Sequence, residues 1–282
     1  MSMDILQKKI RKFKSPILVD MTMTPEDIAP EVLEQAGGYL PAYEKVCMEL
    51  MVGLRELVPA VRFDFACFAV LGAEGLDALN RVLKFAKEQA YFVILEGLCS
   101  DKPAVVSAAL AMPCDGLAIS PYWGSDLIRV YAEGLKESEK SLFVTLRSPN
   151  RSASEVQDLM TGSRLVHQAV ADVLSRLGES LIGKCGYTHI AAAAAANAPE
   201  SIRHLRTKYN RLFLLVDGYD YSNANAKNCS YAFDQFGHGA VICSGTGITA
   251  AWKEQVNCNY VEAAVEAARR MQKNLLRYVA IL

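Results

Sequence analysis

The stretch FVILEGLCSD, residues 92–101, places two carboxylates at the end of an apolar run. Four apolar residues lead directly into Glu96, and Asp101 follows five residues later. Buried strands of α/β proteins often deliver catalytic groups at their carboxyl ends in this way. Leu98 stands between the two acids and cannot hold or transfer a proton. The stretch therefore indicates either a catalytic strand end or a strand end that has lost its catalytic group.

Arg62 is a second residue whose type is unexpected for its position. It lies in the run AVRFDF, residues 60–65, which otherwise has the composition of a buried strand. Arg62 requires an anionic partner, because an unpaired buried charge is very costly. Asp20, Asp64 and Glu96 are the candidate partners, and a bound phosphate is a less favoured alternative.

Polar residues also follow other apolar runs, in the segments LRSPN (146–150), VDGYDYS (216–222) and SGTG (244–247). A single Asp or Ser in such a place often caps a helix, so the prediction rests on the whole set. Acid, base, amide and hydroxyl groups on one rim are typical of a site for a small polar ligand. The glycine-rich turn SGTG can bind a phosphate through its backbone N–H groups.

The elements that must position these residues recur along the whole chain. Amphipathic segments such as 74–89 and 165–181 alternate with short runs that are apolar throughout, a pattern typical of parallel strands covered by helices. Eight such units predict an α/β fold, a (β/α)8 TIM barrel, with a doubly wound sheet as the alternative. The eight predicted strands are residues 16–20, 60–65, 91–96, 116–120, 141–146, 188–194, 211–217 and 239–244.

Composition limits the class of protein. We interpret the 282 residues as one barrel domain, 1–282, with an N-terminal helical extension at 1–15. A net charge of −1 argues against a nucleic-acid partner or an acidic membrane partner. The chain shows no signal segment and no apolar run of roughly 20 residues, so we expect no membrane partner. Its eight cysteines form no CxxC pair and no zinc-ligand spacing, so we expect a reduced, cytoplasmic protein without metal or cofactor.

Four segments in this order resemble the orotidine 5′-phosphate decarboxylase family in its longer bacterial form. The likeness extends over about residues 16–252 and implies a (β/α)8 barrel, a homodimer and a small-molecule ligand such as a nucleotide monophosphate. The segments are VRFDFACFAVLGAEGLDAL (61–79), DGLAISPYWGSD (115–126), LFVTLRSPNRSASEVQDL (142–159) and NAPESIRHLR (197–206).

The resemblance also assigns catalytic positions and shows where this chain departs from them. The family motif DxKxxD, whose lysine donates a proton to the carbon that loses carbon dioxide, corresponds to Glu96, Leu98 and Asp101. The resemblance implies that Asp101 acts across a dimer interface and that Arg62 replaces a strand-2 lysine. Arginine keeps the charge but is a poor proton donor. The candidate catalytic residues are Arg62, Glu96 and Asp101.

The predicted phosphate site departs from the family pattern as well. Ser222 stands where the family has glutamine, and Thr246 stands where it has an arginine that binds phosphate. Asp217 and Asp220 would repel a phosphate dianion. The candidate ligand-binding residues are Asp20, Asp64, Ser148, Asn150, Gln157, Asp217, Tyr219, Ser222, Ser244 and Thr246.

Three functions remain open at this stage. The favoured interpretation is a divergent decarboxylase-like protein with weak or no decarboxylase activity, acting as a non-catalytic barrel that binds a nucleotide or another small molecule. The second is an enzyme of changed reaction that uses the carboxylates on the rim. The third is a decarboxylase with an unusual proton donor.

Overall fold

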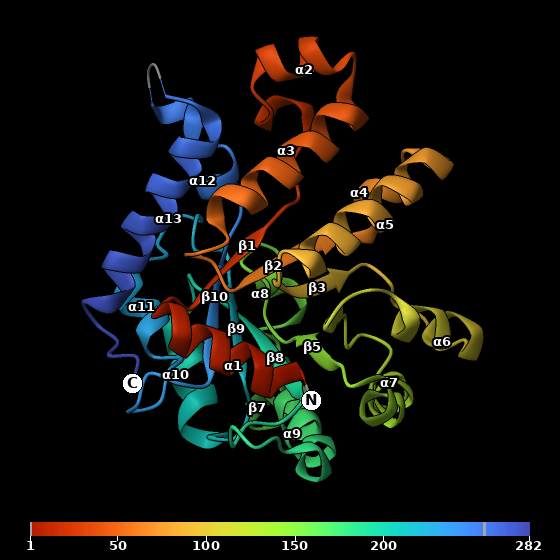
Figure 1. Ribbon diagram of the computed structural model, residues 1–282. Helices are drawn as coiled ribbons and strands as arrows, with labels where there is room; N and C mark the ends of the chain where they lie inside the picture. The colour runs from red at the N-terminus through yellow and green to blue at the C-terminus, as the bar shows by residue number, and fades with distance from the viewer. Residues whose placement is uncertain (1, 256–257) are drawn as a thin grey trace.

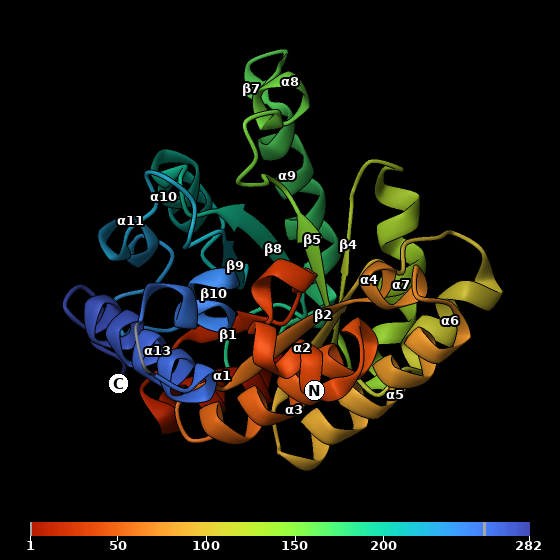
Figure 2. The same cartoon turned by 90° about the horizontal axis from the view of Figure 1, so that it is seen from above.

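Eight parallel strands close into a barrel surrounded by helices (Figures 1 and 2). The computed structural model describes residues 2–255 and 258–282. The closed order β1-β10-β9-β8-β5-β4-β3-β2 confirms the predicted (β/α)8 TIM barrel and each of its eight predicted strands. The barrel strands are β1 (Ile17–Asp20), β2 (Ala60–Asp64), β3 (Phe92–Glu96), β4 (Gly116–Ile119), β5 (Ser141–Thr145), β8 (Ile190–Ala195), β9 (Leu214–Asp217) and β10 (Ala240–Ser244).

The burial pattern along the strands explains why polar groups gather at one rim. In five strands every residue is buried except the last, which is partly exposed. Burying each large apolar side chain stabilises the barrel by roughly 2 kcal/mol, and the chain becomes polar only where it emerges from the core. The five emerging residues are Asp20, Asp64, Glu96, Thr145 and Asp217.

The helices cover the barrel with their apolar faces. The segment 74–89 is helical as expected, and Ala78, Leu79, Val82 and Leu83 are buried at helical spacing. No described helix is long and apolar enough to cross a membrane. The α-helices are α1 (Ser2–Phe13), α2 (Pro30–Ala36), α3 (Tyr39–Leu54), α4 (Phe65–Ala69), α5 (Gly72–Glu88), α6 (Pro103–Ala111), α7 (Ser125–Ser138), α8 (Ala153–Val156), α9 (Val166–Gly178), α10 (Pro199–Lys208), α11 (Ala226–Ser230), α12 (Thr246–Thr249) and α13 (Tyr260–Leu276), and the 3-10 helices are η1 (Pro25–Asp27), η2 (Glu179–Leu181) and η3 (Ala251–Glu254).

Helix α1 packs against the amino-terminal end of the barrel. Met3, Leu6 and Ile10 are fully buried on one of its faces. Ser2 contacts the first residue of β5, and Gln7 accepts a hydrogen bond from the backbone N–H of the residue before β10. Met1 of the predicted extension lies outside the described residues. Because α1 lies at the amino-terminal end, the opposite end is left for ligands.

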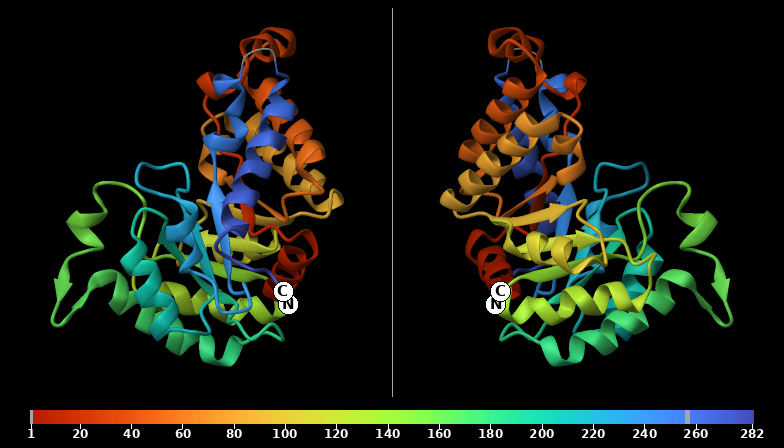
Figure 3. Two further views of the ribbon diagram at one scale, coloured as in Figure 1. Left: turned by 90° about the vertical axis from the view of Figure 1, so that its left-hand side faces the viewer. Right: turned by 90° about the vertical axis from the view of Figure 1, so that its right-hand side faces the viewer.

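The connection after β5 is the main departure from a simple βα unit. Helix α8 is followed by a two-stranded hairpin of β6 (Met160–Thr161) and β7 (Arg164–Leu165) before α9 begins. This segment projects from the barrel (Figures 2 and 3). The short strands carry no strong apolar pattern, and both residues of β6 are exposed, so the hairpin could not be predicted from the sequence.

Candidate functional site

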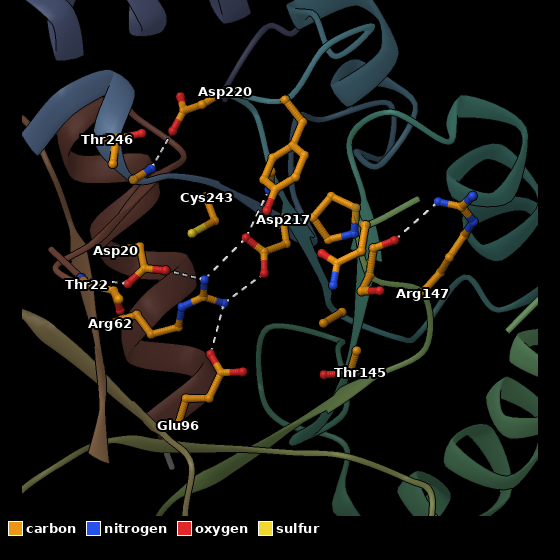
Figure 4. Close-up of a pocket in the computed structure, with 17 residues that line it drawn as sticks. Asp20, Thr22, Arg62, Glu96, Thr145, Arg147, Asp217, Asp220, Cys243 and Thr246 are labelled. Carbon is orange, nitrogen blue, oxygen red and sulfur yellow. Dashed lines mark hydrogen bonds and ion pairs between the residues drawn. The ribbon is translucent and has the colours of Figure 1, made fainter. Parts of the chain in front are cut away.

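A cavity of about 610 Å³ opens at the carboxyl ends of the barrel strands (Figure 4). Its position agrees with the expectation that ligands bind at this end of a (β/α)8 barrel. Seven candidate residues line it, from six strands and the segments that follow them: Asp20, Arg62, Glu96, Ser148, Asn150, Asp217 and Thr246. Among the described residues, no group of three or more His, Cys, Asp and Glu side chains could hold a metal ion.

Arg62 lies among three carboxylates within this cavity (Figure 4). Its Nη2 donates to Asp20 Oδ2 at 2.5 Å, and its Nη1 donates to Asp217 Oδ2 at 2.9 Å. Glu96 Oε2 is 3.4 Å from Nη1. Arg62 is only 8% exposed, so its charge depends on these partners.

Strand register explains how this group assembles. Asp20 on β1 is the direct partner of Arg62 on β2, so the two side chains leave neighbouring strands at the same level. Glu96 ends β3, the next strand around the barrel, and Asp217 ends β9. β9 is not adjacent to β2 in the sheet, and only closure of the barrel brings Asp217 to Arg62.

Burial and charge act against each other at this cluster. Burial opposes the charged form of Arg62, but the carboxylates of Asp20, Asp217 and Glu96 outweigh it and keep the pKa of Arg62 well above its usual value. Burial raises the pKa of Glu96, and the attraction of Arg62 offsets this only in part. Arg62 therefore stays protonated, whereas Glu96 is the group in the cluster suited to exchange a proton.

Asp64 is not a partner of Arg62, which corrects one of the three expected pairings. Its Oδ1 accepts a hydrogen bond from the backbone N–H of Ala66 at 2.8 Å, and Asp64 is the N-cap of α4. The turn into α4 directs this carboxylate to the helix end, and Asp64 does not line the cavity. Asp217, expected to contact the ligand, is the additional partner of Arg62.

The segment after β5 forms one wall of the cavity and is held by a separate polar network. Arg147 forms a two-pronged ion pair with Asp158, with Nε–Oδ1 at 3.0 Å and Nη2–Oδ2 at 2.9 Å. Gln157 Oε1 accepts from the backbone N–H of Ser148 at 2.7 Å. Gln157 therefore positions Ser148 and does not itself line the cavity, while Asn150 does line it.

The turn after β10 forms the opposite wall. The Asp220 carboxylate accepts hydrogen bonds from Ser244 Oγ at 2.6 Å and from the backbone N–H of Gly245 at 2.6 Å. Ser244 is thus engaged with Asp220, and Thr246 faces the cavity beside them. The N–H groups expected to hold a ligand phosphate have a partner within the protein.

Several candidate residues lie away from the cavity. Asp101 is about half exposed and pairs with Lys102 at 3.4 Å, and Ser222 is exposed on the loop after β9. Tyr219 lines a different cavity, of about 490 Å³, together with Lys227. Leu98 packs against the hydrophobic core and does not line the main cavity.

Some cavity residues carried no sequence signal of their own. Thr22 and Tyr221 lie one or two residues beyond acids that were recognised, and Thr145 ends β5. Cys243, next to last in β10, also lines the cavity, but burial raises its pKa well above the usual value and keeps it a thiol. A rule that takes the last residue of every barrel strand and the two that follow would have found Thr22 and Thr145.

The chain is similar to curated proteins from bacteria. It is 28% identical over 255 residues to the orotidine 5′-phosphate decarboxylase of Clostridium novyi, covering 85% of this chain and 88% of that protein. It is 29% identical over 226 residues to the enzyme of the same name from Rhodopirellula baltica, covering 76% and 75%. No model of a known protein family matches the chain.

Solved structures support the same relationship at the level of the fold. The OMP decarboxylase of Leishmania donovani superposes with a TM-score of 0.78 at 21% identity, covering 98% of both chains. The orotidine 5′-monophosphate decarboxylase of Plasmodium berghei superposes with a TM-score of 0.78 at 13% identity, covering 98% of this chain and 97% of that one.

Proposed function

We propose, from the similarity to curated orotidine 5′-phosphate decarboxylases, that the chain is a divergent member of that family. Its cavity binds a nucleotide-like or other small polar molecule but does not decarboxylate orotidine 5′-phosphate at an ordinary enzymatic rate. The observation that carries the proposal is Leu98, at the position where the family pattern has the proton-donating lysine. An alkyl side chain cannot deliver a proton to a developing carbanion.

Neighbouring cations do not supply the missing donor. Arg62 is at the centre of the cavity, but its three carboxylate partners hold its proton. Lys102 follows Leu98 by four residues, yet its side chain is 76% exposed and it does not line the cavity. A proton donor must come within hydrogen-bond reach of the reacting atom, and neither cation supports that role.

A changed reaction is the second candidate, and Glu96 is the observation in its favour. Its carboxylate borders the cavity and contacts Arg62, and burial raises its pKa. A carboxyl group whose pKa is moved toward neutrality can act as a general acid or base. Asp20, Asp217 and Arg62 would then fix its position and the charge around it.

Decarboxylation of orotidine 5′-phosphate, measured on protein from a host that lacks its own decarboxylase, tests the proposal. We expect the wild type to be slower than an ordinary enzyme by about 100- to 10,000-fold, since a positioned general acid contributes 10²–10⁴-fold. The Leu98→Lys variant restores an ammonium group next to Glu96, and we expect its rate to exceed that of the wild type by at least about 10-fold.

Leu98→Met is the matched control, because it keeps an apolar side chain of similar volume. We expect it to be as inactive as the wild type. Wild-type turnover at an ordinary enzymatic rate would contradict the proposal and would show that another group donates the proton.

We also propose that the protein is a homodimer in a reducing compartment such as the cytoplasm. The resemblance implies the dimer, with Asp101 reaching the partner's site. The side chain of Asp101 is 49% exposed and it does not line the cavity of its own chain, which supports this role. All eight cysteines are free thiols, which supports a reducing compartment.

A further inference from the structure

Asp220 occupies a set of hydrogen-bond donors that is suited to an anion. Its carboxylate accepts from Ser244 Oγ at 2.6 Å, from the Gly245 N–H at 2.6 Å and from the Gly247 N–H at 3.3 Å. Two backbone N–H groups and a hydroxyl that converge on one oxyanion form the kind of concavity that binds phosphate in many proteins. Here the anion belongs to the protein itself.

The glycine at position 247 is fitted to this carboxylate. A Cβ added at Gly247 would lie 2.3 Å from Asp220 Oδ1 and 2.8 Å from its Cγ. Any other residue at position 247 would therefore collide with the carboxylate group in its present place. The Asp220 carboxylate can approach this closely because residue 247 has no side chain, so the contact is specific to this pair.

The charge of the cavity disfavours a second anion. Four carboxylates line it, those of Asp20, Glu96, Asp217 and Asp220, against two guanidinium groups, those of Arg62 and Arg147. Arg147 is already paired with Asp158, and Arg62 with three of the acids. A phosphate dianion would enter without a free cation and would meet an excess of like charge.

We propose that Asp220 is an internal substitute for a ligand phosphate, so that the cavity accepts a neutral or cationic polar ligand and excludes one that carries phosphate at the turn after β10. The inference rests on the proposed function in one respect, namely that this cavity is the ligand site. It adds the class of ligand, which would be a non-phosphorylated polar molecule such as a nucleoside.

Titration with inorganic phosphate tests this inference directly. Isothermal calorimetry and thermal unfolding would be run on the wild type, Asp220→Ala and Asp220→Asn. We expect Asp220→Ala to bind phosphate at least about 10-fold more tightly than the wild type, because it vacates three donors and removes a negative charge. Asp220→Asn removes the charge but keeps an acceptor oxygen, and we expect an affinity between the other two.

Asp77→Asn is the matched control for a general change in charge. Asp77 is exposed on α5 and does not line the cavity, so the variant should bind phosphate as weakly as the wild type. Two outcomes would overturn the inference: a wild type that binds phosphate as tightly as Asp220→Ala, or an Asp220→Ala variant that folds and gains no affinity. If Asp220→Ala does not fold, failure of Asp220→Asn to gain affinity overturns it instead.

This titration is independent of decarboxylation. A wild type that is inert toward orotidine 5′-phosphate but binds phosphate tightly overturns only the inference about Asp220. A wild type that decarboxylates orotidine 5′-phosphate at an ordinary rate overturns both, because that substrate carries a phosphate into the cavity.

Discussion

Arg62 neutralises a buried cluster of acids, and its removal tests how strongly the protein depends on that neutralisation. In Arg62→Met, Asp20, Glu96 and Asp217 would face one another without a cation. Removing one member of a buried charge network costs roughly 3–5 kcal/mol of the free energy of unfolding. Because the three carboxylates are partly exposed, we expect a loss near the lower limit, about 3 kcal/mol, measured by urea unfolding at about pH 8.

The loss should become smaller as the pH falls. Burial already raises the pKa of Glu96, and loss of the attraction of Arg62 raises it further. The folded protein then binds protons more readily than the unfolded chain, and acid relieves the repulsion. Arg81→Met is the control, since Arg81 pairs with Glu44 at the surface. This variant should lose less than about 1 kcal/mol of the free energy of unfolding. A loss in Arg62→Met that is the same at about pH 5 and pH 8 would refute the electrostatic account.

Part of this cluster could be predicted from the residues alone. A buried arginine requires an anionic partner. Of the expected partners, Asp20 and Glu96 do form ion pairs with Arg62. The pairing of Asp217 with Arg62 was not predicted. The two residues are 155 positions apart in the sequence, and Asp217 approaches from across the barrel, so no sequence pattern indicates their contact. The role of Asp64 as a helix cap depends on the turn into α4, which follows the strand without a gap.

At the scale of elements, a buried histidine couples α1 to the barrel. His189 is fully buried, and its Nδ1 is 3.0 Å from Ser141 Oγ, which in turn is 2.7 Å from Ser2 Oγ. Burial lowers the pKa of His189 to about 4, and the attraction of Asp4 does not offset this. The neutral imidazole is therefore the form that fits between α1 and the starts of β5 and β8.

We expect this histidine to make the fold sensitive to acid. Since the pKa is lower in the folded state, the unfolded chain takes up the proton first, and stability is lost as the pH falls from about 6.5 to about 4. A shift of this size corresponds to about 3 kcal/mol. The free energy of unfolding measured across this range should fall less steeply in His189→Gln than in the wild type.

His238→Gln provides the comparison for that measurement, because His238 is only partly buried and contacts the last residue of the chain. It should keep the acid sensitivity of the wild type. Equal slopes in the wild type and His189→Gln would assign the sensitivity to other groups.

The predictability of the elements follows from how each one is stabilised. The barrel strands are buried on both faces, so their apolar runs appear in the sequence, and all eight were identified. Helix α6 begins at Pro103, since proline is favoured in the first turn. The β6–β7 hairpin is exposed and polar, and α12 is a single turn. Neither therefore shows a hydrophobic periodicity in the sequence.

At the scale of the whole molecule, exposed apolar residues follow β2 and β4, the two strands on either side of β3. Val70 follows β2 and is 81% exposed, while Tyr122 and Trp123 follow β4 and are 81% and 58% exposed. The loop after β3, which carries Asp101, lies between them and is held to α7 by a hydrogen bond from Tyr131 to the Leu98 carbonyl at 2.9 Å. Large apolar groups on one rim are typical of an interface between subunits.

The last prediction is that this rim holds two chains together. Light scattering on the wild type should give twice the chain mass of 30.9 kDa. The dimer of the double variant Tyr122→Ser with Trp123→Ser should dissociate into single chains at concentrations at least about 100-fold higher than the wild-type dimer does. Tyr278→Ser, which alters a 55%-exposed tyrosine after α13, should leave the dimer intact. A wild type of single-chain mass at micromolar concentration would refute the dimer, and it would then leave Asp101 without a site to complete, because Asp101 does not line the cavity of its own chain.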